Sequence, residues 1–327
     1  MGFADGHGLR TIRAMAEYHT IANDVLRAEI APLGASLVGL WTNAGRNLVL
    51  GLSDLERVEK MPGTAGSIVG PIANRIGNAS VTLDGTVWNM AANEGTTTLH
   101  SGPTGTQKRN WSVIAETPTR VTLSISLSHG DCGLPGNRKI EAVYELDGPN
   151  LILTLTGETD EDTYLNLAHH PYWSLDDRDD TSGHELRVMA DWMVVVGPDK
   201  VPTGAVTTAA GPFQLSKGGL IPLDADHCYC LGGRRFDSPK LAAKLHGSDG
   251  TMMSIETTEP GLQVYSGSNL PKLAAEACRG KTIQPFAGVA LEPQGWPDAP
   301  NHPHFPSVRV SKGEPNRQVT RYCFQNI

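Results

Sequence analysis

The stretch Val121-Thr-Leu-Ser-Ile-Ser-Leu-Ser128 decides the fold class, because apolar and hydroxyl side chains alternate in it without a break. Successive side chains of a β-strand point to opposite faces, so this alternation predicts a strand with one buried face. The same alternation recurs in Ile140-Glu-Ala-Val-Tyr-Glu-Leu146 and continues in Leu151–Thr156. The turn signal Asp147-Gly-Pro-Asn150 separates these two segments, which together predict an antiparallel hairpin.

Further strand candidates are bounded by Gly, Pro, Asp or Asn: Leu186–Val196, Met252–Thr257, Gly261–Ser266, Val308–Val310 and Gln318–Gln325. Helical patterning is restricted to Ser53–Lys60 and Pro271–Cys278, so a regular alternation of strands and helices is not expected. No linker, repeat or low-complexity segment divides the chain. We therefore expect an all-β fold, a large two-sheet sandwich over residues 1–327 as one domain, with residues 1–18 as a loosely ordered extension.

The composition excludes several classes of protein. A formal net charge of -8 without a run of Lys and Arg argues against a nucleic-acid partner, because neutralising phosphates requires clustered basic residues. No apolar stretch approaches the roughly 18 residues of a membrane span, and Met1–Tyr18 lacks the apolar centre of a signal peptide. We expect a soluble, cytoplasmic protein without membrane partners, whose scattered cysteines are free thiols: Cys132, Cys228, Cys230, Cys278 and Cys323.

A polar cluster interrupts the apolar pattern at Asn166-Leu-Ala-His-His-Pro-Tyr-Trp-Ser-Leu175. Histidine titrates near neutral pH and therefore suits proton transfer, while Tyr172 and Trp173 are suited to line a pocket or to stack on a sugar ring. On the local sequence alone, two hydrogen-bonded structural histidines are an equal alternative. Because neighbouring strand residues point to opposite faces, we expect only one of His169 and His170 to be catalytic.

Near the C-terminus, Glu292 follows the apolar run Gly288-Val-Ala-Leu291 and precedes a Pro-rich loop. Burying a carboxyl group costs free energy unless the group has a partner or a purpose, and a buried carboxyl with a pKa set by its surroundings suits a general base. The alternative is an ordinary glutamate at a strand end, facing solvent. The segment alone does not decide between the two.

Two glycine-bordered segments supply hydrogen-bond donors, Arg75 in Gly70-Pro-Ile-Ala-Asn-Arg-Ile-Gly77 and His100 in Thr98-Leu-His-Ser-Gly102. Glycine permits the close approach of a ligand, so both side chains are candidates for binding hydroxyl groups. The alternatives are a surface ion pair for the arginine and a turn position for the histidine.

The segment Leu223-Asp-Ala-Asp-His-Cys-Tyr-Cys-Leu231 presents Asp226 as a hydrogen-bond acceptor for sugar hydroxyls. Zinc is the competing interpretation, but His227, Cys228 and Cys230 lack ordinary ligand spacing and would lie on both faces of a strand. His302-Pro-His304 has no partnered acid and is interpreted as solvated surface. We therefore predict no metal.

A nucleotide cofactor has no visible binding loop in this sequence. Arg279-Gly-Lys-Thr282 resembles the end of a phosphate-binding loop, but Ala275 stands where the first glycine is required. No glycine-rich dinucleotide fingerprint opens a βα unit either. We expect no cofactor, and chemistry carried out by side chains alone.

Taken in order, these segments resemble the signature blocks of the aldose 1-epimerase (galactose mutarotase) family, from about Ala31 to the C-terminus. The blocks in the family's order are Gly70–Gly77 (GRxANRI), Leu99–Gly102 with Lys108–Trp111 (LHGG…KRxW), Gly130–Gly136 (DGxxGYPG), Asn166–Leu175 (NLTNHSYFNL), Asp226–Tyr229 (DH), Thr257–Gly267 and Leu291–Gln294. The resemblance implies a large antiparallel β super-sandwich with a sugar site in a groove on one sheet.

The resemblance also implies roles for single residues. His170 takes the place of the catalytic histidine and Glu292 that of the general base. Glu292 would remove the proton of the anomeric hydroxyl while protonated His170 donates a proton to the ring oxygen, after which the open chain rotates about C1–C2 and recloses. The expected partner is a free monosaccharide and the expected state a monomer or homodimer. The residues that would bind or orient the sugar are Arg75, His100, Asp226, Asn74 and Tyr172.

Three positions depart from the family pattern: Thr97 stands where Asn is frequent, Ser101 replaces a Gly, and His169 replaces an Asn. These departures leave the preferred sugar open, because hydroxyl recognition depends on each polar partner. Galactose and glucose are the family's usual substrates, and arabinose, fucose, xylose or a sugar acid are alternatives.

Two other classes of function compete with the epimerase interpretation. A non-catalytic sugar-binding or sugar-sensing protein on the same fold would not need both His170 and Glu292. A glycoside hydrolase could use Asp226 and Glu292 as its two carboxyl groups, but the histidine would then have no role. A phosphosugar substrate would need a cluster of Arg or Lys around the motifs, and the sequence shows none.

Overall fold

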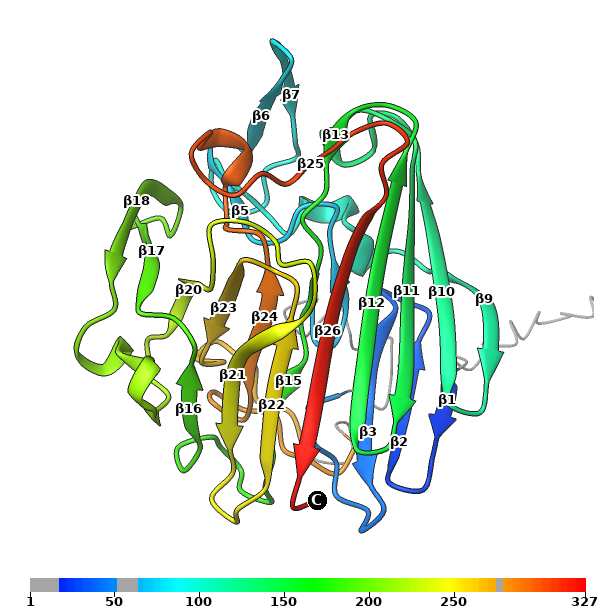
Figure 1. Cartoon of the computed structure of the whole chain (residues 1–327), viewed down its shortest axis with the longest axis vertical. Coiled ribbons are helices and arrows are strands. Elements are labelled where there is room, and N and C mark those ends of the chain that lie inside the picture. Colours follow the sequence, from blue (N-terminus) through cyan, green and yellow to red (C-terminus); the bar gives the residue numbers. More distant parts are fainter. Residues whose placement is uncertain (1–17, 52–63, 275–278) are drawn as a thin grey trace, which may run out of the picture.

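The computed structural model describes residues 18–51, 64–274 and 279–327, and two large antiparallel sheets dominate it (Figure 1). The larger sheet has nine strands in the order β19-β16-β21-β22-β26-β12-β11-β10-β9. In chain order these strands are Ser112–Thr117 (β9), Arg120–Leu127 (β10), Arg138–Asp147 (β11), Asn150–Thr159 (β12), Glu185–Val188 (β16), Gly219–Leu220 (β19), Lys240–His246 (β21), Met252–Thr257 (β22) and Asn316–Gln325 (β26).

The second large sheet has six strands in the order β15-β24-β23-β20-β17-β18. They are Tyr172–Trp173 (β15), Trp192–Val196 (β17), Pro202–Thr208 (β18), Asp226–Cys230 (β20), Gly261–Tyr265 (β23) and Val289–Gln294 (β24). Smaller ladders surround the two sheets: β1-β2-β3 (His19–Ala22, Leu26–Ala31, Ser36–Thr42), β4 with β14 (Ile68–Val69, Ala168–His169), β5 with β8 (Arg75–Ile76, Thr98–Leu99), β6 with β7 (Ser80–Leu83, Thr86–Asn89), and β13 with β25 (Thr163–Tyr164, Arg309–Val310).

The helical segments of the described residues are all short 3-10 turns, so the predicted all-β class is confirmed. They are Gly77–Ala79, Gly102–Thr104, Thr106–Lys108, Asp131–Gly133, Gly211–Phe213, Leu215–Lys217 and Ala299–Asn301. The helix predicted at Ser53–Lys60 lies outside the described residues, as do residues 1–17 of the predicted extension. At Pro271–Cys278 the helix prediction is wrong for the part described, because Leu273 forms a β-bridge with Ile283.

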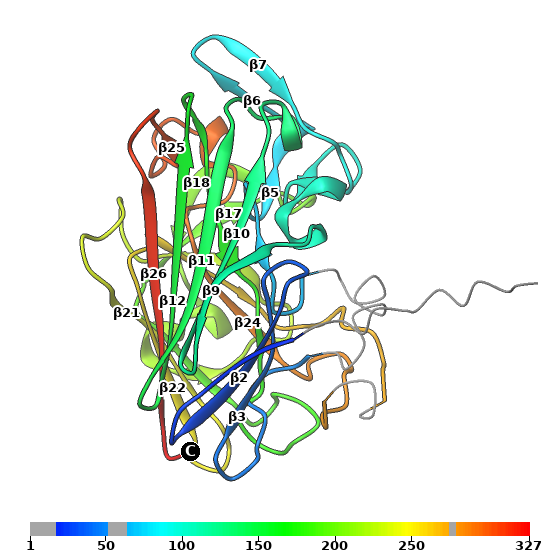
Figure 2. The same ribbon diagram turned by 90° about the vertical axis from the view of Figure 1, so that its right-hand side faces the viewer.

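The hairpin predicted from the alternating segments is present as β11 and β12. Asp147 pairs with Asn150 across the two intervening residues, and Gly148 adopts a φ of 53°, which glycine tolerates without steric cost. β10 pairs with β11 and β26 with β12, so four long strands lie side by side in the larger sheet (Figure 2). The sequence alternation therefore predicted the strands and, in β11 and β12, the buried face of each. In β10 the expectation of a single buried face is wrong for Thr122 and Ser124, which are buried on the other face.

The strand predicted at Leu186–Val196 is in fact two strands in different sheets. β16 pairs with β21 in the larger sheet, whereas β17 pairs with β18 and β20 in the smaller one. The chain crosses between the sheets at Met189–Asp191, where backbone hydrogen bonds to Ala242 and from Ala209 continue the two ladders. Apolar side chains occur on both sides of the crossing and no Gly or Pro marks it, so the sequence pattern alone could not locate it.

One hydrophobic core lies between the two large sheets. It joins Leu123 and Leu153 of the larger sheet to Leu262, Val264 and Leu291 of the smaller one, all nearly or fully buried. Trp173 of the smaller sheet is fully buried and packs on rings of β26, with centroids 4.7 Å from Tyr322 and 5.9 Å from Phe324. Burial of aromatic and aliphatic side chains from both sheets stabilises the sandwich.

The other face of the smaller sheet carries polar side chains. Glu292 pairs in register with Gln263, and Gln263 pairs with Cys228, so these three side chains share one face. Their neighbours Leu262 and Leu291 point the other way, into the core. Period-two alternation thus separates the core from a polar surface on which a site can form.

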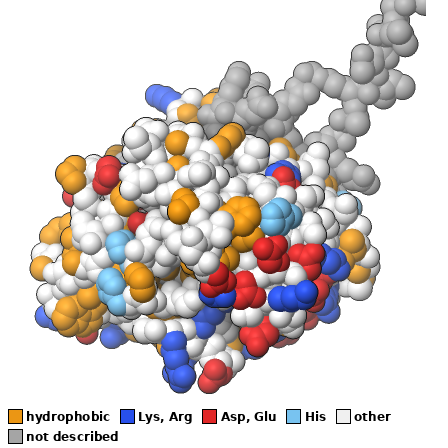
Figure 3. Space-filling model, turned by 90° about the horizontal axis from the view of Figure 1, so that it is seen from above, with side chains coloured by type: hydrophobic (Ala, Val, Ile, Leu, Met, Phe, Trp, Pro, Cys, Tyr) orange, Lys and Arg blue, Asp and Glu red, His pale blue; other side chains and the backbone are white. Residues whose placement is uncertain are grey.

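The end of the molecule that carries β6 and β7 is fastened by charged side chains. Arg309 contacts Asp84 at 2.8 Å and Asp162 at 2.5 Å, which ties the β6–β7 turn to the segments around β13 and β25. Figure 3 views this end from above and shows acidic and basic side chains intermixed there. Among the described residues no helix is both long enough and apolar enough to cross a membrane.

Candidate active site

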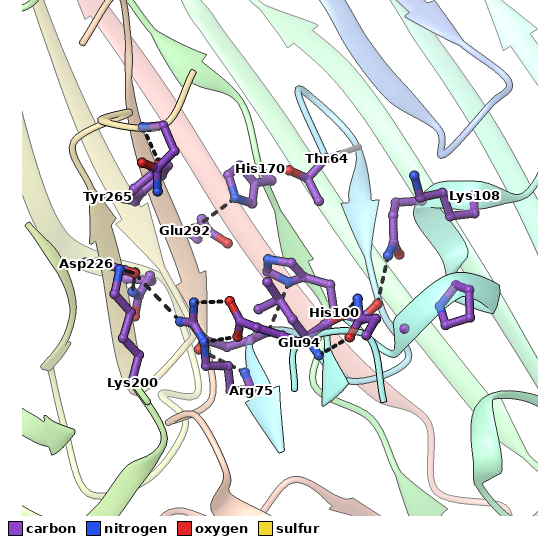
Figure 4. A pocket seen from close by; sticks show the side chains of 18 of the residues that line it. Thr64, Arg75, Glu94, His100, Lys108, His170, Lys200, Asp226, Tyr265 and Glu292 are labelled. Atoms are coloured by element: carbon purple, nitrogen blue, oxygen red, sulfur yellow. Dashed lines mark hydrogen bonds and ion pairs between the residues drawn. The ribbon is translucent and has the colours of Figure 1, made fainter. Parts of the chain in front are cut away.

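A cavity of about 530 Å³ opens on the polar face of the smaller sheet (Figure 4). This volume falls in the range of small-molecule sites. The sheet supplies one wall, with Asp226, Gln263, Tyr265 and Glu292, and loops around β5 and β8 supply the other. All seven predicted site residues line this single cavity: Asn74, Arg75, His100, His170, Tyr172, Asp226 and Glu292.

His170 and Glu292 face each other inside the cavity. Nε2 of His170 lies 3.4 Å from Oε1 of Glu292, and both side chains are almost completely buried. The backbone of His170 is held on both sides, because its N–H donates to Ser67 at 3.0 Å and its carbonyl accepts from Gly66 at 2.8 Å. The other polar atoms of the pair, Nδ1 of His170 and Oε2 of Glu292, have no protein hydrogen-bond partner. A histidine and a carboxyl group are thus in position to exchange protons with a ligand.

His169 points away from this cavity, as the alternation predicted. Its ring lies in the core between Tyr144 and Tyr322, with centroids 5.6 Å and 5.7 Å away. Nδ1 lies 3.1 Å from the hydroxyl of Tyr322. The two adjacent histidines therefore occupy different environments, and only His170 reaches the cavity.

Burial sets the protonation of the pair. It lowers the pKa of His170 from its ordinary 6.5 to about 4 and raises the pKa of Glu292 well above its ordinary value. The negative charge of Asp226 raises the pKa of Glu292 further, whereas the positive charge of Arg75 lowers it. Both main shifts favour the neutral form of each group, so in the empty cavity a proton shared by the pair is favoured on Glu292 rather than on His170.

A charged network lies beside the pair. Oδ1 of Asp226 accepts a hydrogen bond from Gln263 at 2.8 Å, and Oδ2 accepts one from Nζ of Lys200 at 2.7 Å. Arg75 lies 3.7 Å from Oδ2 of Asp226 and donates twice to Glu94, at 2.6 Å and 3.1 Å. The network leaves carboxylate oxygens and cationic donors on the cavity wall, a combination suited to hydroxyl groups.

His100 and Asn74 hold each other in left-handed backbone conformations, with φ of 51° and 63°. The N–H of His100 donates to the carbonyl of Asn74 at 3.0 Å, and the N–H of Asn74 donates to Nδ1 of His100 at 3.1 Å. Burial lowers the pKa of His100 well below its ordinary value. Because Nδ1 accepts, the neutral ring carries its proton on Nε2 and can donate that proton to a ligand.

Sequence reasoning did not name several polar residues that line the cavity, among them Glu94, Lys200, Gln263 and Tyr265. The last two could have been found, because they alternate along β23 inside a quoted block and pair with β20 and β24. Glu94 and Lys200 carry no local signal, because both are charged loop residues of a kind that is usually solvated.

The competing zinc interpretation placed its ligands on both strand faces, and the structure confirms that placement. His227 packs on Phe213, with centroids 4.7 Å apart, while Cys228 lies on the face of Glu292. His302 and His304 are not simply solvated: their Nε2 atoms lie 3.3 Å and 2.7 Å from carbonyl oxygens of β18. The surface interpretation of that pair is therefore incomplete.

An antiparallel β-sandwich that holds a buried histidine–carboxyl pair in a polar cavity has the groups needed to move protons on a small polar ligand. The model of the aldose 1-epimerase family matches residues 17–323, nearly the whole chain. The chain therefore belongs to the aldose 1-epimerase family and is an isomerase.

Relatives and solved structures agree with this assignment. The chain is 32% identical to a galactose mutarotase of Sus scrofa, with 94% of each chain covered, and 30% identical to an aldose 1-epimerase of Escherichia coli, with 90% and 89% covered. The structure of an aldose epimerase homologue from C. elegans superposes with a TM-score of 0.87 at 29% identity, covering 95% of this chain and 99% of that one. A galactose 1-epimerase from Lactobacillus acidophilus shares the fold, with a TM-score of 0.80 at 24% identity and 94% of each chain covered.

Proposed function

We propose that this aldose 1-epimerase uses His170 and Glu292 as its catalytic acid and base. The observation that carries the proposal is the 3.4 Å approach of Nε2 of His170 to Oε1 of Glu292, with both side chains buried on one cavity wall. General acid–base catalysis requires groups within hydrogen-bonding reach of the protons they move, and a sugar in this cavity would lie within such reach.

The reaction proceeds through ring opening. Ionised Glu292 takes the proton of the anomeric hydroxyl, the C1–O5 bond breaks, and protonated His170 gives its proton to the ring oxygen. The C1–C2 bond of the resulting aldehyde rotates, and reclosure returns both protons with the opposite configuration at C1. Each group ends a full cycle as it began, so the pair turns over without an added reactant.

Five residues bind the sugar in this proposal. Asp226 accepts hydrogen bonds from hydroxyl groups, while Arg75, Asn74 and His100 donate to them. Tyr172 contacts the sugar with its ring, which lies 5.1 Å from the ring of His170 and 6.2 Å from that of Tyr265. This arrangement combines polar contacts at the ring edge with apolar contact at one face.

The proposed substrate is a free monosaccharide, and galactose is the first candidate because several relatives are named galactose mutarotase. Glucose and related aldoses are further candidates. The cytoplasmic location, the absence of a cofactor and the monomeric or homodimeric state stay predictions from the sequence.

Polarimetry of freshly dissolved α-D-galactose and α-D-glucose tests the proposal. The wild-type protein should accelerate relaxation to the same final rotation that the uncatalysed sugar reaches. Glu292→Gln and His170→Ala should each lower kcat/KM by at least about a hundredfold, because each removes one proton-transfer group. His246→Ala, at an exposed position on β21, is the matched histidine control and should keep wild-type activity.

Two results would contradict the proposal. If Glu292→Gln and His170→Ala retain wild-type rates while folding normally by circular dichroism, the catalytic assignment is wrong. If the wild-type protein accelerates no aldose but releases reducing ends from a disaccharide, hydrolysis replaces epimerisation as the reaction.

A further inference from the structure

Lys200 is a partly exposed lysine whose ammonium group is directed at an aspartate of the cavity wall. Its ammonium group contacts Asp226 at 2.7 Å, yet its side chain is 45% exposed (Figure 4). An exposed lysine gains little stability from one ion pair, since solvent screens the charges and holding the side chain costs entropy. Stability alone therefore does not account for a lysine directed at this aspartate.

The turn that carries Lys200 is firmly built. Lys200 connects β17 to β18 with a left-handed φ of 61°, and its N–H donates to Gly197 at 2.9 Å, while Gly197 donates to Val201 at 2.8 Å. Val201 packs against Gly77, where an added Cβ would meet its side chain at 3.1 Å. The turn is thus attached directly beside β5, the strand that contains Arg75.

The two histidines of the loop after β24 contact the β18 strand of the same hairpin. Nε2 of His302 lies 3.3 Å from the carbonyl of Pro202, and Nε2 of His304 lies 2.7 Å from that of Gly204. Gly204, with a φ of 86°, leaves room for these rings, because an added Cβ would meet Nδ1 of His302 at 2.9 Å. Segments distant in sequence therefore fix the place from which Lys200 reaches the cavity.

We propose that Lys200 is a specificity-determining residue that binds the sugar together with Asp226, the lysine donating to one hydroxyl and the aspartate accepting from the adjacent one. The inference rests on the proposed function, because it assumes that a sugar occupies this cavity. It assigns to the β17–β18 turn a direct part in the choice of sugar.

The geometry of the pair matches two neighbouring hydroxyls. Nζ of Lys200 and Oδ2 of Asp226 are 2.7 Å apart, so two neighbouring hydroxyls of one pyranose ring can each come within hydrogen-bonding distance of one of the two groups. An ammonium has three protons and no acceptor, whereas a carboxylate accepts only, so the pair can orient both hydroxyls. Asp226 remains oriented while it does so, because Gln263 holds its other oxygen at 2.8 Å.

The experiment combines a variant with a set of deoxy sugars. Mutarotation kinetics and calorimetric binding are measured for wild type and Lys200→Met, with the best aldose and with its 2-, 3-, 4- and 6-deoxy analogues. Lys200→Met should raise KM and Kd for the parent sugar about tenfold and leave kcat within about twofold, since a hydrogen bond to a charged donor is lost in ground and transition states alike. With the one analogue that lacks the lysine-bound hydroxyl, the variant and wild type should have the same affinity.

A matched control separates this role from loss of any ion pair. Lys139→Met removes a lysine that contacts Glu141 at 2.6 Å on β11, with a side chain 55% exposed, and should leave KM unchanged. The proposal is overturned if Lys200→Met leaves the affinity for the parent sugar unchanged. It is equally overturned if the variant weakens the parent and every deoxy analogue by the same factor, which would mean that Lys200 only positions Asp226. If wild type binds the sugars but does not interconvert them, the catalytic proposal fails while the comparison of affinities still tests the lysine.

Discussion

Replacing His169 by Asn should change how the stability of the protein depends on pH. His169 is 2% exposed, and its Nε2 has no protein hydrogen-bond partner. Burial lowers its pKa from 6.5 to about 3, so the folded protein keeps this ring neutral under mildly acidic conditions. The family pattern has Asn at the position of His169, which makes the exchange a conservative one for the fold.

The magnitude follows from proton linkage. Below pH 6.5 the unfolded chain binds a proton at this histidine and the folded chain does not, so acidification favours unfolding. Between pH 7 and pH 5 this one residue lowers the free energy of unfolding by about 2 kcal/mol, from 1.36 kcal/mol per unit over roughly 1.5 units. This change in free energy is set by the pKa of the histidine in the unfolded chain, because any pKa below about 4 in the folded protein gives nearly the same result.

Urea denaturation at pH 7, 6 and 5, followed by circular dichroism, measures the effect. Other buried histidines destabilise wild type and His169→Asn alike in acid. The informative quantity is therefore the difference between the two proteins in how steeply the free energy of unfolding falls with pH. His169→Asn should lose about 2 kcal/mol less than wild type between pH 7 and pH 5. His246→Asn, the same exchange at an exposed position, provides the control and should follow wild type. Equal slopes for His169→Asn and wild type would refute the assignment of a buried, neutral His169.

Two further predictions concern activity. The pH profile of kcat/KM should fall below about pH 4, where His170 takes up a second proton, and fall again at higher pH, where the pair loses its proton from Glu292. Activity that rises steadily on acidification through pH 5 would contradict this expectation. Glu94→Gln should raise KM severalfold with little change in kcat, because Arg75 loses a carboxylate that accepts two of its hydrogen bonds. Steady-state polarimetry measures both constants, and an unchanged KM would show that Glu94 does not orient Arg75 for binding.

The sequence predicted the long strands well and the short ones poorly. β10, β11 and β12 have eight to ten residues each, enough for alternation to be unmistakable. β5 and β8 have two residues each, too few to show any period, yet they carry Arg75 and border His100. Their pairing depends on contacts between segments far apart in the chain, which local pattern does not contain.

The residues of the site also differ in how far the sequence could predict them. His170 and Glu292 were recognisable as candidates because a histidine or a carboxyl group beside an apolar run is chemically conspicuous. The choice of His170 over His169 and the role of Glu292 came from the family resemblance. Lys200 was not recognisable as a site residue, because a lysine in a Gly-Pro-Asp-Lys turn normally faces solvent. Its importance arises only when the β17–β18 hairpin brings it to Asp226, 26 positions later in the chain.

The opposed pKa shifts of the pair bear on the proposed reaction. In the empty cavity burial favours a proton on Glu292 and a neutral His170, which is the arrangement left after ring opening. Ring opening must start from the other arrangement, ionised Glu292 and protonated His170, which has the same net charge and differs by one proton moved between the two groups. Arg75 lowers the pKa of Glu292, while Asp226 raises the pKa of His170. Arg75 therefore opposes the effect of burial, whereas Asp226 raises the pKa of both groups and so favours a proton on the pair without deciding which of the two carries it.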